Sequence, residues 1–458
     1  MISRTPSLRI IALHALGLLG VALLACSCSD EPPARSTETD AGDAGAVQQA
    51  DASSDVFDAG QDAGEDAAAL PPPTPYDFAV NCTANPCVTR IAASGGGHAC
   101  AVLQDGTVRC WGANASGQLG TGASDAGPAP EYEATPRTVV GIANATSVAA
   151  VGRGTSGSSC VVSGAGEVAC FGSNVWGQLG RAVGPSDVPH PEPVVIDALR
   201  TKSVTLAGKF ALAVGTDDRL WSWGANDSFQ LARQPSVPPA GPSSPPALAD
   251  MISSPVRACS GTENSGFVLT SNGDLLSWGG GIAEQLGRMS SLHQDPIPAP
   301  ILLSDVSSVT AGATHACALT HGSVHCWGGK NENGQLGTGV RVQKMLPARV
   351  ELPKDVYPVA VAAGGNNTCA IAATGELYCW GANGAGQLGI GTRQDQPNPT
   401  RIEGLPEQVV GVAVMDDAVC ALLRNGSVAC WGDNLVGQLG RGSRDTEIHL
   451  EAAPVVFQ

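Results

Sequence analysis

Residues 91–120 read IAASGGGHACAVLQDGTVRCWGANASGQLG, and the order of features in this stretch decides the fold. A short apolar run, a glycine-rich turn, a Cys-Ala strand, a tight turn, a strand ending in Cys-Trp-Gly and a Gly-Gln-Leu-Gly segment follow one another. The same order returns at residues 309–337 (VTAGATHACALTHGSVHCWGGKNENGQLG) and at residues 361–389 (VAAGGNNTCAIAATGELYCWGANGAGQLG). Short β-branched runs on either side of Asp-Gly or His-Gly tips are typical of antiparallel hairpins.

The aromatic-glycine marker of this stretch occurs seven times in the chain. Successive markers are separated by 60 residues at most, from Trp111 to Phe171, and by 49 at least, from Trp278 to Trp327. A period of this size indicates supersecondary units that bury a core only by stacking on one another. We expect the aromatic residues to pack inside the units rather than to bind a ligand. Phe171 takes this place in the second unit, and the tryptophans of the other units are Trp111, Trp223, Trp278, Trp327, Trp380 and Trp431.

The combined pattern of Gly-Gly, His or Asn, Cys-Ala-Leu, Trp-Gly and Gly-Gln-Leu-Gly resembles the repeats of the regulator of chromosome condensation family. The resemblance covers roughly residues 88–458, whereas WD and Kelch repeats carry different markers. It implies an all-β fold, a seven-bladed β-propeller. The run Pro454-Val455-Val456-Phe457 supplies a spare strand at the end of the last unit. We expect this C-terminal strand to close the ring against the first unit, which removes an exposed edge.

Cysteines occur in pairs that are symmetric about the hairpin tips of five units. Facing residues on antiparallel strands have Cα atoms about 4.5 to 5.5 Å apart, which is within disulfide reach. The third and fourth units lack both members and carry Ser222 and Ser277 before the Trp-Gly marker. Loss in pairs favours disulfides over metal binding, because no two-residue cysteine spacing links the pairs to a second cluster. The expected bonds are Cys100–Cys110, Cys160–Cys170, Cys317–Cys326, Cys369–Cys379, Cys420–Cys430 and, at the domain entrance, Cys82–Cys87.

Besides Cys26 in the N-terminal segment, two cysteines are left without a partner in this scheme. Cys28 lies near the N-terminus and Cys259 lies on the first strand of the fourth unit. For Cys259 the sequence favours a buried thiol that packs as a small hydrophobe. A reactive thiol is the alternative, but no nearby base is evident.

The first 25 residues have the layout of a secretory signal peptide. Arg4 and Arg9 precede an apolar run, residues 10–25, which ends in Leu-Leu-Ala before Cys26. This ending resembles the lipobox of bacterial lipoproteins, and the resemblance implies cleavage before Cys26 and lipidation of its thiol. An ordinary signal peptide with a chance cysteine is the alternative. Acyl chains on Cys26 would anchor the protein without a membrane-spanning segment.

Residues 26–80 are expected to be a disordered tether that joins the lipidated cysteine to the propeller at residues 81–458. The segment repeats Asp-Ala-Gly, contains the run Pro71-Pro72-Pro73 and has a strong excess of acid over base. Such a composition cannot bury enough apolar surface to offset its ordering entropy. Calcium binding by the aspartates is the alternative, but their spacing is irregular and no twelve-residue calcium loop is present.

Charge and motifs exclude several classes of function. The formal net charge is −17, much of it in the tether, and no basic stripe exists that would bind nucleic acid. His98 and His315 recur at the same position of their units, so we expect hydrogen bonds within the blades rather than catalysis or metal binding. No hydrolase, phosphate-loop or paired-carboxylate motif is present. The sequence therefore predicts neither a cofactor nor a metal nor an enzyme activity.

The segments after Gly-Gln-Leu-Gly differ most between units, in particular residues 123–134, 181–193 and 233–255. Insertions of this kind emerge on one face of a repeat fold, which is often the binding face. We expect a monomeric cell-envelope lipoprotein, held at the outer membrane or surface of a Gram-negative bacterium by its lipid alone. Its propeller would bind an unknown protein or glycan through one loop face.

Three other functions stay open at this stage. A secreted β-lactamase inhibitor protein is similar to this repeat family, so inhibition of an extracellular enzyme is the main alternative. A hydrolase with a site at the ring axis has weaker support. The guanine-nucleotide exchange of the family's namesake is not expected, because export separates the chain from a cytosolic GTPase.

Overall fold

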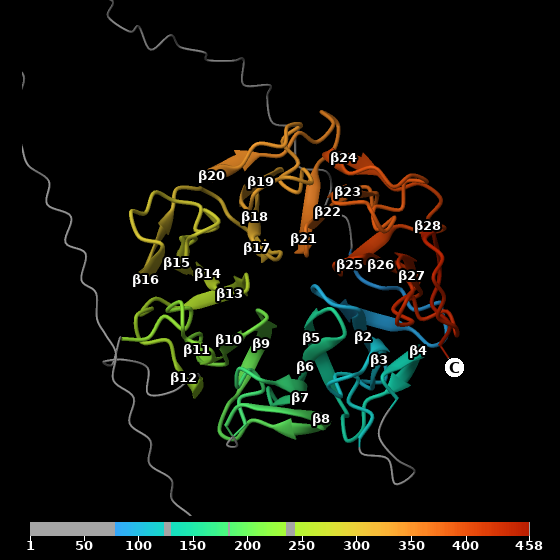
Figure 1. Ribbon diagram of the computed structural model, residues 1–458, viewed down its shortest axis with the longest axis horizontal. Helices are drawn as coiled ribbons and strands as arrows, with labels where there is room; N and C mark the ends of the chain where they lie inside the picture. Colours follow the sequence, from blue (N-terminus) through green and yellow to red (C-terminus); the bar gives the residue numbers. More distant parts are fainter. Residues whose placement is uncertain (1–77, 123–129, 182–183, 235–242, 458) are drawn as a thin grey trace, which may run out of the picture. The chain divides into compact units, whose positions relative to one another are not determined.

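The computed structural model describes residues 78–122, 130–181, 184–234 and 243–457. All regular elements within these residues are β-strands, and they form seven four-stranded antiparallel sheets. The sheets stand as blades around a ring (Figure 1). The seven-bladed all-β propeller expected from the repeats is therefore confirmed.

Each blade consists of four consecutive strands. Blades one and two contain β1 (Val88–Ala92), β2 (His98–Leu103), β3 (Val108–Ala113), β4 (Tyr132–Thr138), β5 (Ala145–Arg153), β6 (Ser156–Ser163), β7 (Val168–Asn174) and β8 (Ser186–Val195). Blades three and four contain β9 (Thr201–Leu206), β10 (Phe210–Gly215), β11 (Leu220–Gly224), β12 (Ser244–Leu248), β13 (Val256–Gly261), β14 (Ser265–Thr270), β15 (Leu275–Gly280) and β16 (Gln294–Ile301). Blades five, six and seven contain β17 (Ser308–Ala311), β18 (His315–Thr320), β19 (Ser323–Gly328), β20 (Lys344–Arg349), β21 (Pro358–Gly364), β22 (Asn367–Ala372), β23 (Leu377–Gly381), β24 (Gln396–Arg401), β25 (Val409–Val414), β26 (Ala418–Leu423), β27 (Val428–Gly432) and β28 (His449–Pro454).

The two faces of the ring differ in the turns they carry. The first strand of each blade lies toward the centre of the ring and the fourth lies at its rim (Figure 1). In an antiparallel meander the turns after the first and third strands lie at one end. We name this end the loop face. The opposite end, the hairpin face, carries the central hairpin turns and the connections between blades.

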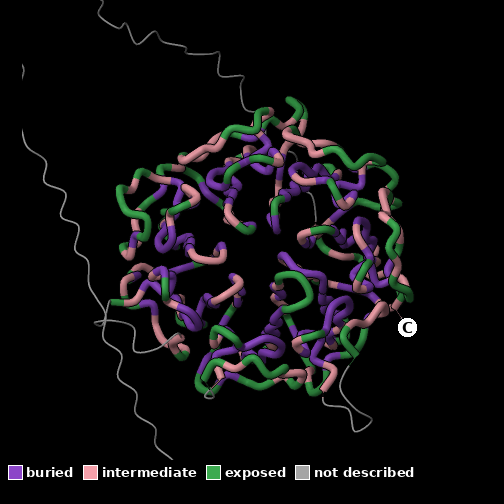
Figure 2. Tube along the Cα trace, viewed as in Figure 1, coloured by how far each residue is buried: buried purple, intermediate pink, exposed green. Residues whose placement is uncertain are grey.

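The core lies between neighbouring blades. The second strands β2, β10, β14, β22 and β26 are buried along their whole length, and exposed residues gather at the turns and the rim (Figure 2). Burial of apolar surface contributes about 25 cal/mol per Å² relative to the exposed chain. Because both sides of these middle strands are covered, each blade depends on its two neighbours for its stability.

A hydrogen bond from each tryptophan marker joins its blade to the one before it. The six indole rings of these markers are fully buried, and each Nε1–H donates to the main-chain oxygen of the glutamine in a Gly-Gln-Leu-Gly segment or its variant, at 2.8 to 2.9 Å. The pairs are Trp111–Gln438, Trp223–Gln178, Trp278–Gln230, Trp327–Gln285, Trp380–Gln335 and Trp431–Gln387. The two repeated motifs thus form one contact, made across the boundary between units.

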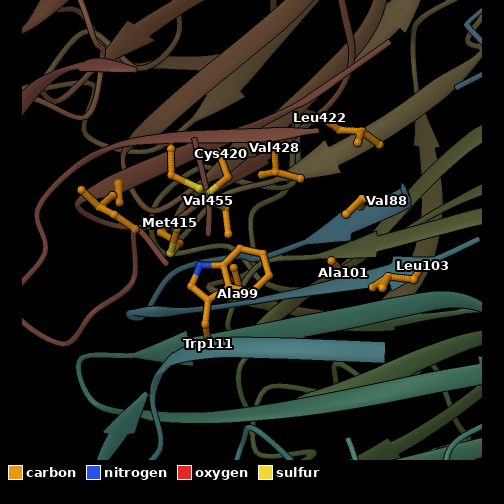
Figure 3. Packing of buried hydrophobic residues seen from close by; sticks show 13 residues of the cluster. Val88, Ala99, Ala101, Leu103, Trp111, Met415, Cys420, Leu422, Val428 and Val455 are labelled. Carbon is orange, nitrogen blue, oxygen red and sulfur yellow. A yellow bond between two sulfur atoms is a disulfide. The ribbon is translucent and has the colours of Figure 1, made fainter. Parts of the chain in front are cut away.

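The C-terminal end closes the ring by a different contact from the one expected. Strand β28 pairs with β27, with Cys430 opposite Ala453, and so completes the seventh blade. The expectation that the C-terminal residues close the ring against the first unit is confirmed, but the closure is made by side chains and not by strand pairing. Val455 is instead buried in one cluster with Trp111 of blade one (Figure 3), and the Phe457 ring lies edge-on to the Trp111 ring at 5.9 Å between centroids. The closure is made by side-chain packing and by the Trp111–Gln438 bond.

The N-terminal end strengthens the same seam from the hairpin face. The main-chain nitrogen of Asn81 donates to the oxygen of Arg424 at 2.8 Å, and that of Val88 donates to the oxygen of Gly426 at 2.8 Å. A disulfide between Cys82 and Cys87 holds the intervening segment. The chain therefore enters the propeller across the tip of the seventh blade before it begins the first.

Candidate functional site

The two recurring histidines are structural, as the sequence predicted. His98 Nε2 lies 3.0 Å from Ser159 Oγ, and His315 Nε2 lies 2.8 Å from Thr368 Oγ1, each on the next blade. Ser159 donates its own hydroxyl proton to the main-chain oxygen of Gln118 at 2.9 Å, so His98 is the donor in their contact. Burial lowers the pKa of both imidazoles to about 4. They are neutral at pH 7 and fixed between blades.

All six expected disulfides are present, and the five hairpin bonds have Cα–Cα distances of 4.1 Å. In each of the five, the two half-cystines face one another directly, as Cys100 faces Cys110. The facing-strand register drawn from the sequence is therefore correct. These residues are buried and reach no surface at which they could act on a ligand.

Cys259 is the free cysteine of the described residues, whereas Cys26 and Cys28 lie outside them. Cys259 is half-buried, and its Sγ lies 3.8 Å from Thr205 Oγ1 of blade three. Burial raises the pKa of the Cys259 thiol to about 12, partly offset by the hydrogen bond with Thr205. A thiol with so high a pKa holds almost no thiolate at pH 7, so it is a poor nucleophile.

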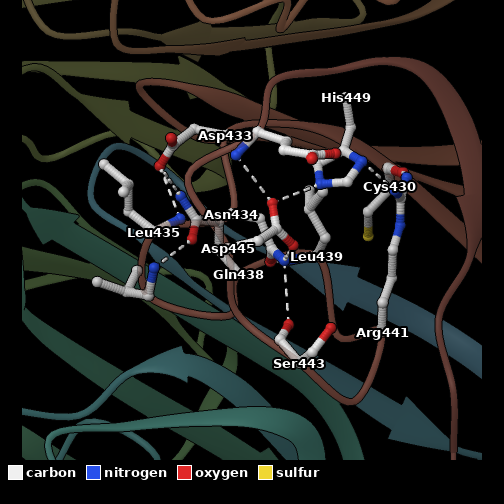
Figure 4. A network of polar contacts seen from close by, with 12 residues as sticks. Cys430, Asp433, Asn434, Leu435, Gln438, Leu439, Arg441, Ser443, Asp445 and His449 are labelled. Carbon is white, nitrogen blue, oxygen red and sulfur yellow. Dashed lines mark hydrogen bonds and ion pairs between the residues drawn. The ribbon is translucent and has the colours of Figure 1, made fainter.

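A histidine–aspartate pair in blade seven resembles a catalytic dyad, but its hydrogen bonds hold a loop in place (Figure 4). His449 Nε2 lies 2.9 Å from Asp445 Oδ1, and Asn434 Nδ2 donates to Asp445 Oδ2 at 2.7 Å. Arg441 Nη1 lies 2.8 Å from His449 Nδ1. Because arginine only donates, Nδ1 is the acceptor and both imidazole nitrogens are occupied. No nitrogen remains free to act as a base, so this network holds the loop between β27 and β28 in place.

A charged and aromatic cluster on the loop face brings together residues from three blades. Lys209 Nζ lies 5.1 Å from the centre of the Trp176 ring and 3.2 Å from Glu263 Oε1. Arg153 Nη1 lies 3.6 Å from Glu263 Oε1. Trp176 and Arg153 belong to blade two, Lys209 to blade three and Glu263 to blade four. We name these four residues the Trp176 cluster.

The Trp176 cluster is accessible and rests on fixed turns. Trp176 remains 37% exposed and the Arg153 side chain 87% exposed. The main-chain nitrogen of Trp176 donates to Gln178 Oε1 at 2.8 Å, and the turn that carries Glu263 is held by Ser265, whose nitrogen donates to Thr262 Oγ1 at 3.1 Å. Exposed tryptophan and arginine on a rigid support are typical of protein-binding hot spots.

An acidic pair lies on the turn between β25 and β26 of blade seven, on the same face. Asp416 Oδ2 accepts a hydrogen bond from the nitrogen of Gly96 at 3.1 Å, which ties blade seven to blade one. Burial raises the pKa of Asp416, partly offset by this bond and by the charge of Arg153. Burial also raises the pKa of Asp417, and the charges of Asp416 and Asp433 raise it further. The loop face thus carries cations at blades two and three and anions at blade seven.

The sequence prediction placed the binding loops in a different part of the units. The segments after Gly-Gln-Leu-Gly lead into the fourth strands, such as β4, which begins at Tyr132, and β8, which begins at Ser186. Residues 123–129, 182–183 and 235–242 lie outside the described part. Three residues of the Trp176 cluster lie instead at the turns after the first strands of their blades. The fourth, Trp176, lies two residues before the repeated glutamine Gln178. The other units carry Ser, Ala, Asn or Val where the second unit has Trp176. Comparing this position between units would therefore have singled out Trp176 from the sequence.

The described residues supply neither a metal site nor a membrane-spanning helix. Among them, no three His, Cys, Asp or Glu side chains form a group that could hold a metal ion. Over the same residues, no helix has the length and apolar character needed to cross a membrane.

Comparison with known proteins adds a family model and several relatives. The model of the RCC1-like domain matches residues 55–414 of this chain. The ultraviolet-B receptor UVR8 of Arabidopsis thaliana is 27% identical over 365 residues, which cover 79% of this chain and 80% of the receptor. The E3 ubiquitin-protein ligase HERC2 of Homo sapiens is 32% identical over 247 residues, which cover 52% of this chain but only 5% of that protein.

Solved structures agree on the fold. Prp20p of Saccharomyces cerevisiae superimposes with a TM-score of 0.66 at 20% identity, covering 77% of this chain and 86% of that one. Human WBSCR16 gives a TM-score of 0.63 at 22% identity, covering 75% of this chain and 88% of that one. At these identities the likeness shows the architecture alone.

Proposed function

The chain belongs to the RCC1-like family, and on this premise we propose that its propeller is a protein-binding scaffold of the cell envelope. Yeast Prp20p is described with binding properties to Gsp1p and histones, and it has been solved bound to Kap60. Those partners belong to Prp20p. What we transfer to this chain is the use of an RCC1-like propeller as a platform for another protein.

The observation that carries the proposal is the Trp176 cluster. A tryptophan, a lysine, a glutamate and an arginine from three blades meet on the loop face. Glu263 offsets the two cations only in part, which leaves Arg153 directed to solvent. Such a surface suits a partner that offers an apolar side chain to Trp176 and a carboxylate to Arg153.

We further propose that the scaffold is exported and held in the cell envelope by a lipid on Cys26, as a monomer with no other membrane contact. The sequence of the first 26 residues supports this arrangement, since Arg4 and Arg9 precede an apolar run that ends at Cys26. The Cys26→Ser variant should lose lipid and leave the membrane fraction, or remain as precursor. A mature Cys26→Ser protein that still needs detergent for extraction would contradict this part of the proposal.

Binding rather than catalysis is also part of the proposal. The two buried histidines each contact the next blade through Nε2 and lie away from solvent, and both nitrogens of His449 are occupied. The proposal assigns no reaction, no cofactor and no nucleic-acid partner to the chain.

The experiment compares variants of the full chain in quantitative pull-downs from envelope and culture proteins. A specific partner should be captured by the wild type and reduced at least about tenfold by Trp176→Ala or Arg153→Ala, which corresponds to about 1.4 kcal/mol. Leu435→Ala is the matched control, since Leu435 is a 51% exposed apolar residue of blade seven in the equivalent loop. A partner lost equally in all three variants, or in none, would count against the Trp176 cluster.

A further inference from the structure

A cleft on the hairpin face, where blades four, five and six meet, is not used by the function proposed above. Its volume is about 710 Å³, within the range of roughly 300 to 1,000 Å³ that holds small molecules. The residues that line it and matter here are Arg257, Asp305, Ser307, Thr320, His321 and Tyr357. It lies on the face opposite the Trp176 cluster.

A break in the repeat pattern lies at this cleft. The half-cystines of blade five are separated by 9 residues, against 10 in the other four cystine hairpins. Thr320 therefore pairs directly with Ser323, and the turn shrinks to His321-Gly322. The shortened turn forms part of the wall of the cleft. Gly322 has a φ of 74°, and a Cβ there would lie 2.7 Å from Tyr357 Cε2, so the tyrosine ring sits directly on the small turn.

The walls combine an aromatic surface with groups that suit hydroxyls. The Tyr357 and His321 rings meet edge-to-face with centroids 6.0 Å apart. Arg257 uses one N–H on the main-chain oxygen of Val306, and its side chain is otherwise exposed. Asp305 is exposed and makes no hydrogen bond or ion pair through its side chain among the described residues. One arginine and one carboxylate cancel in formal charge, so the cleft has no electrostatic preference for a phosphate or a carboxylate ligand.

We propose that this cleft binds a neutral saccharide. A sugar ring has an apolar C–H face, which fits against an aromatic ring such as Tyr357, and a rim of hydroxyls. The Asp305 carboxylate can accept hydrogen bonds from two hydroxyl groups, and the free N–H groups of Arg257 can donate to hydroxyl oxygens. The hydroxyls of Ser307 and Thr320 donate to main-chain oxygens at 3.1 and 3.2 Å, which leaves their lone pairs as acceptors.

The test is titration of the full chain with maltose, cellobiose and chitobiose by calorimetry and saturation-transfer NMR, with inorganic phosphate as the charged comparison. At least one disaccharide should bind with a Kd below about 10 mM, and phosphate should not compete. Asp305→Asn and Tyr357→Ala should each weaken binding at least about tenfold, because a charge-assisted hydrogen bond or the aromatic surface is lost. Tyr357→Phe keeps the ring and should bind within about threefold of the wild type.

Two further variants separate the cleft from the rest of the propeller. Tyr132→Ala removes a tyrosine of β4 outside the cleft and should leave saccharide binding unchanged. Insertion of one residue after Thr320, which restores the spacing of the other cystine hairpins, should abolish binding while Cys317 and Cys326 still form their disulfide. The proposal is overturned if none of the disaccharides binds, if phosphate displaces them, or if Asp305→Asn binds like the wild type. Because Asp305 is exposed and Tyr357→Phe is conservative, these two variants still test the proposal if Tyr357→Ala does not fold.

Discussion

Blades three and four fasten their third strands differently from the other five blades. In the cystine blades a disulfide joins the second strand to the third, as between Cys100 and Cys110. In blade three the facing pair is Leu212 and Ser222, and in blade four it is Phe267 and Ser277. The covalent bond is replaced by an apolar side chain packed opposite a hydroxyl.

An arginine joins the third strand to the fourth in both of these blades, as Arg181 and Arg441 also do in cystine blades two and seven. Arg288 Nε donates to Ser277 Oγ at 3.1 Å, and its Nη2 donates to the main-chain oxygens of Ser277 and Ile297, both at 3.1 Å. Arg233 makes the same contacts to Ser222 and to the main-chain oxygen of Ala247. The arginine therefore joins the third strand to the fourth. A blade therefore forms with or without the cystine between its second and third strands, and the arginine clamp between the third and fourth strands occurs in blades of both kinds.

The largest expected effect is a loss of folding stability in acid, caused by buried histidines in cystine blades one and five. The unfolded chain protonates His98 and His315 near pH 6.5, but burial holds their folded-state pKa values at about 4. Because the unfolded state then binds more protons, the stability that these residues contribute is full above about pH 6.5 and falls as the pH is lowered to about 4. The loss is about 3 kcal/mol per histidine at pH 4.

Denaturant unfolding from pH 7 to pH 4 measures this effect. The double variant His98→Gln, His315→Gln keeps an N–H near each Nε2 position and should show a flatter profile than the wild type. Equal slopes for the two proteins would show that the histidines do not account for acid sensitivity. Blades three and four carry Phe210 and Ser265 at the equivalent position, so they make no such contribution.

The next effect is specific to blade four. Arg288 Nη1 and Asp295 Oδ2 lie 2.8 Å apart, with both side chains only 11% exposed. Arg288→Met should destabilise the protein by about 3 kcal/mol, because Asp295 is left buried without its cation. Arg233→Met in blade three should cost less, since no carboxylate lies within ion-pair distance of Arg233 among the described residues. Urea unfolding of the two variants checks the order, and the reverse order would contradict our account of the fastening.

Asp295 also adds a pH signature to the same variant. Burial raises the pKa of Asp295, but the hydrogen bonds from Arg288, from the Ile297 nitrogen and from Ser290 outweigh it, and the net pKa is lowered. A carboxyl with a lowered folded-state pKa contributes stability above its unfolded pKa, and this is lost as the pH falls through the folded value. The difference in the free energy of unfolding between the wild type and Arg288→Met should therefore become smaller below about pH 4.

Removal of one cystine should have a slightly smaller effect. The Cys369→Ala, Cys379→Ala variant should lose about 2–3 kcal/mol, because each disulfide closes a small loop. The ring should stay assembled, since the Trp380–Gln335 bond at 2.9 Å does not involve the cystine. Calorimetry should show one cooperative transition at a lower Tm. A separate early transition would instead show that blade six had become independent of its neighbours.

A cystine introduced into blade three should have a modest effect in the opposite direction. Leu212 and Ser222 occupy the register of a cystine, so Leu212→Cys with Ser222→Cys should form a disulfide. The net gain should be about 1 kcal/mol, because lost packing of Leu212 and a lost acceptor for Arg233 offset part of the 2–3 kcal/mol. Mass spectrometry under non-reducing conditions detects the bond. The reduced double variant is the control, and it should be less stable than the wild type.

The smallest effect is expected at Cys259, on the seam between blades three and four. Cys259→Ser should change the free energy of unfolding by less than about 1 kcal/mol, since the thiol is only half-buried and makes one weak contact. With its pKa raised to about 12, the thiol should react slowly with a disulfide reagent at pH 8 in the folded protein and rapidly after unfolding. Fast reaction in the folded state would show that the seam opens.

The sequence predicted the blades well because their signals are local. Cys100 and Cys110 are symmetric about one turn, so their pairing follows from spacing alone. The place of the last strand could not be predicted in this way. In a circular array of units, the sequence does not show whether the fourth strand of a unit pairs with its own blade or with the next blade. Only the pairing of β28 with β27 decides between them.

The candidate sites needed the three-dimensional arrangement. Arg153, Trp176, Lys209 and Glu263 are far apart in the chain, and none of them stands out within its own unit as a binding residue. They meet only because the first turns of blades two, three and four lie close to the segment after β7 that carries Trp176. The missing residue in the hairpin of blade five was visible in the sequence, but the cleft that it borders requires Arg257 and Tyr357 from the neighbouring blades.

Since every blade is a continuous piece of chain, the seam between blades seven and one is of the same kind as the six that the chain crosses. The Trp111–Gln438 bond at this open seam has the same geometry as Trp327–Gln285 at a linked one. The order of the blades around the ring is therefore independent of where the chain starts. A circular permutant that joined the present ends and opened the chain between blades four and five, after Leu302, should fold to the same ring.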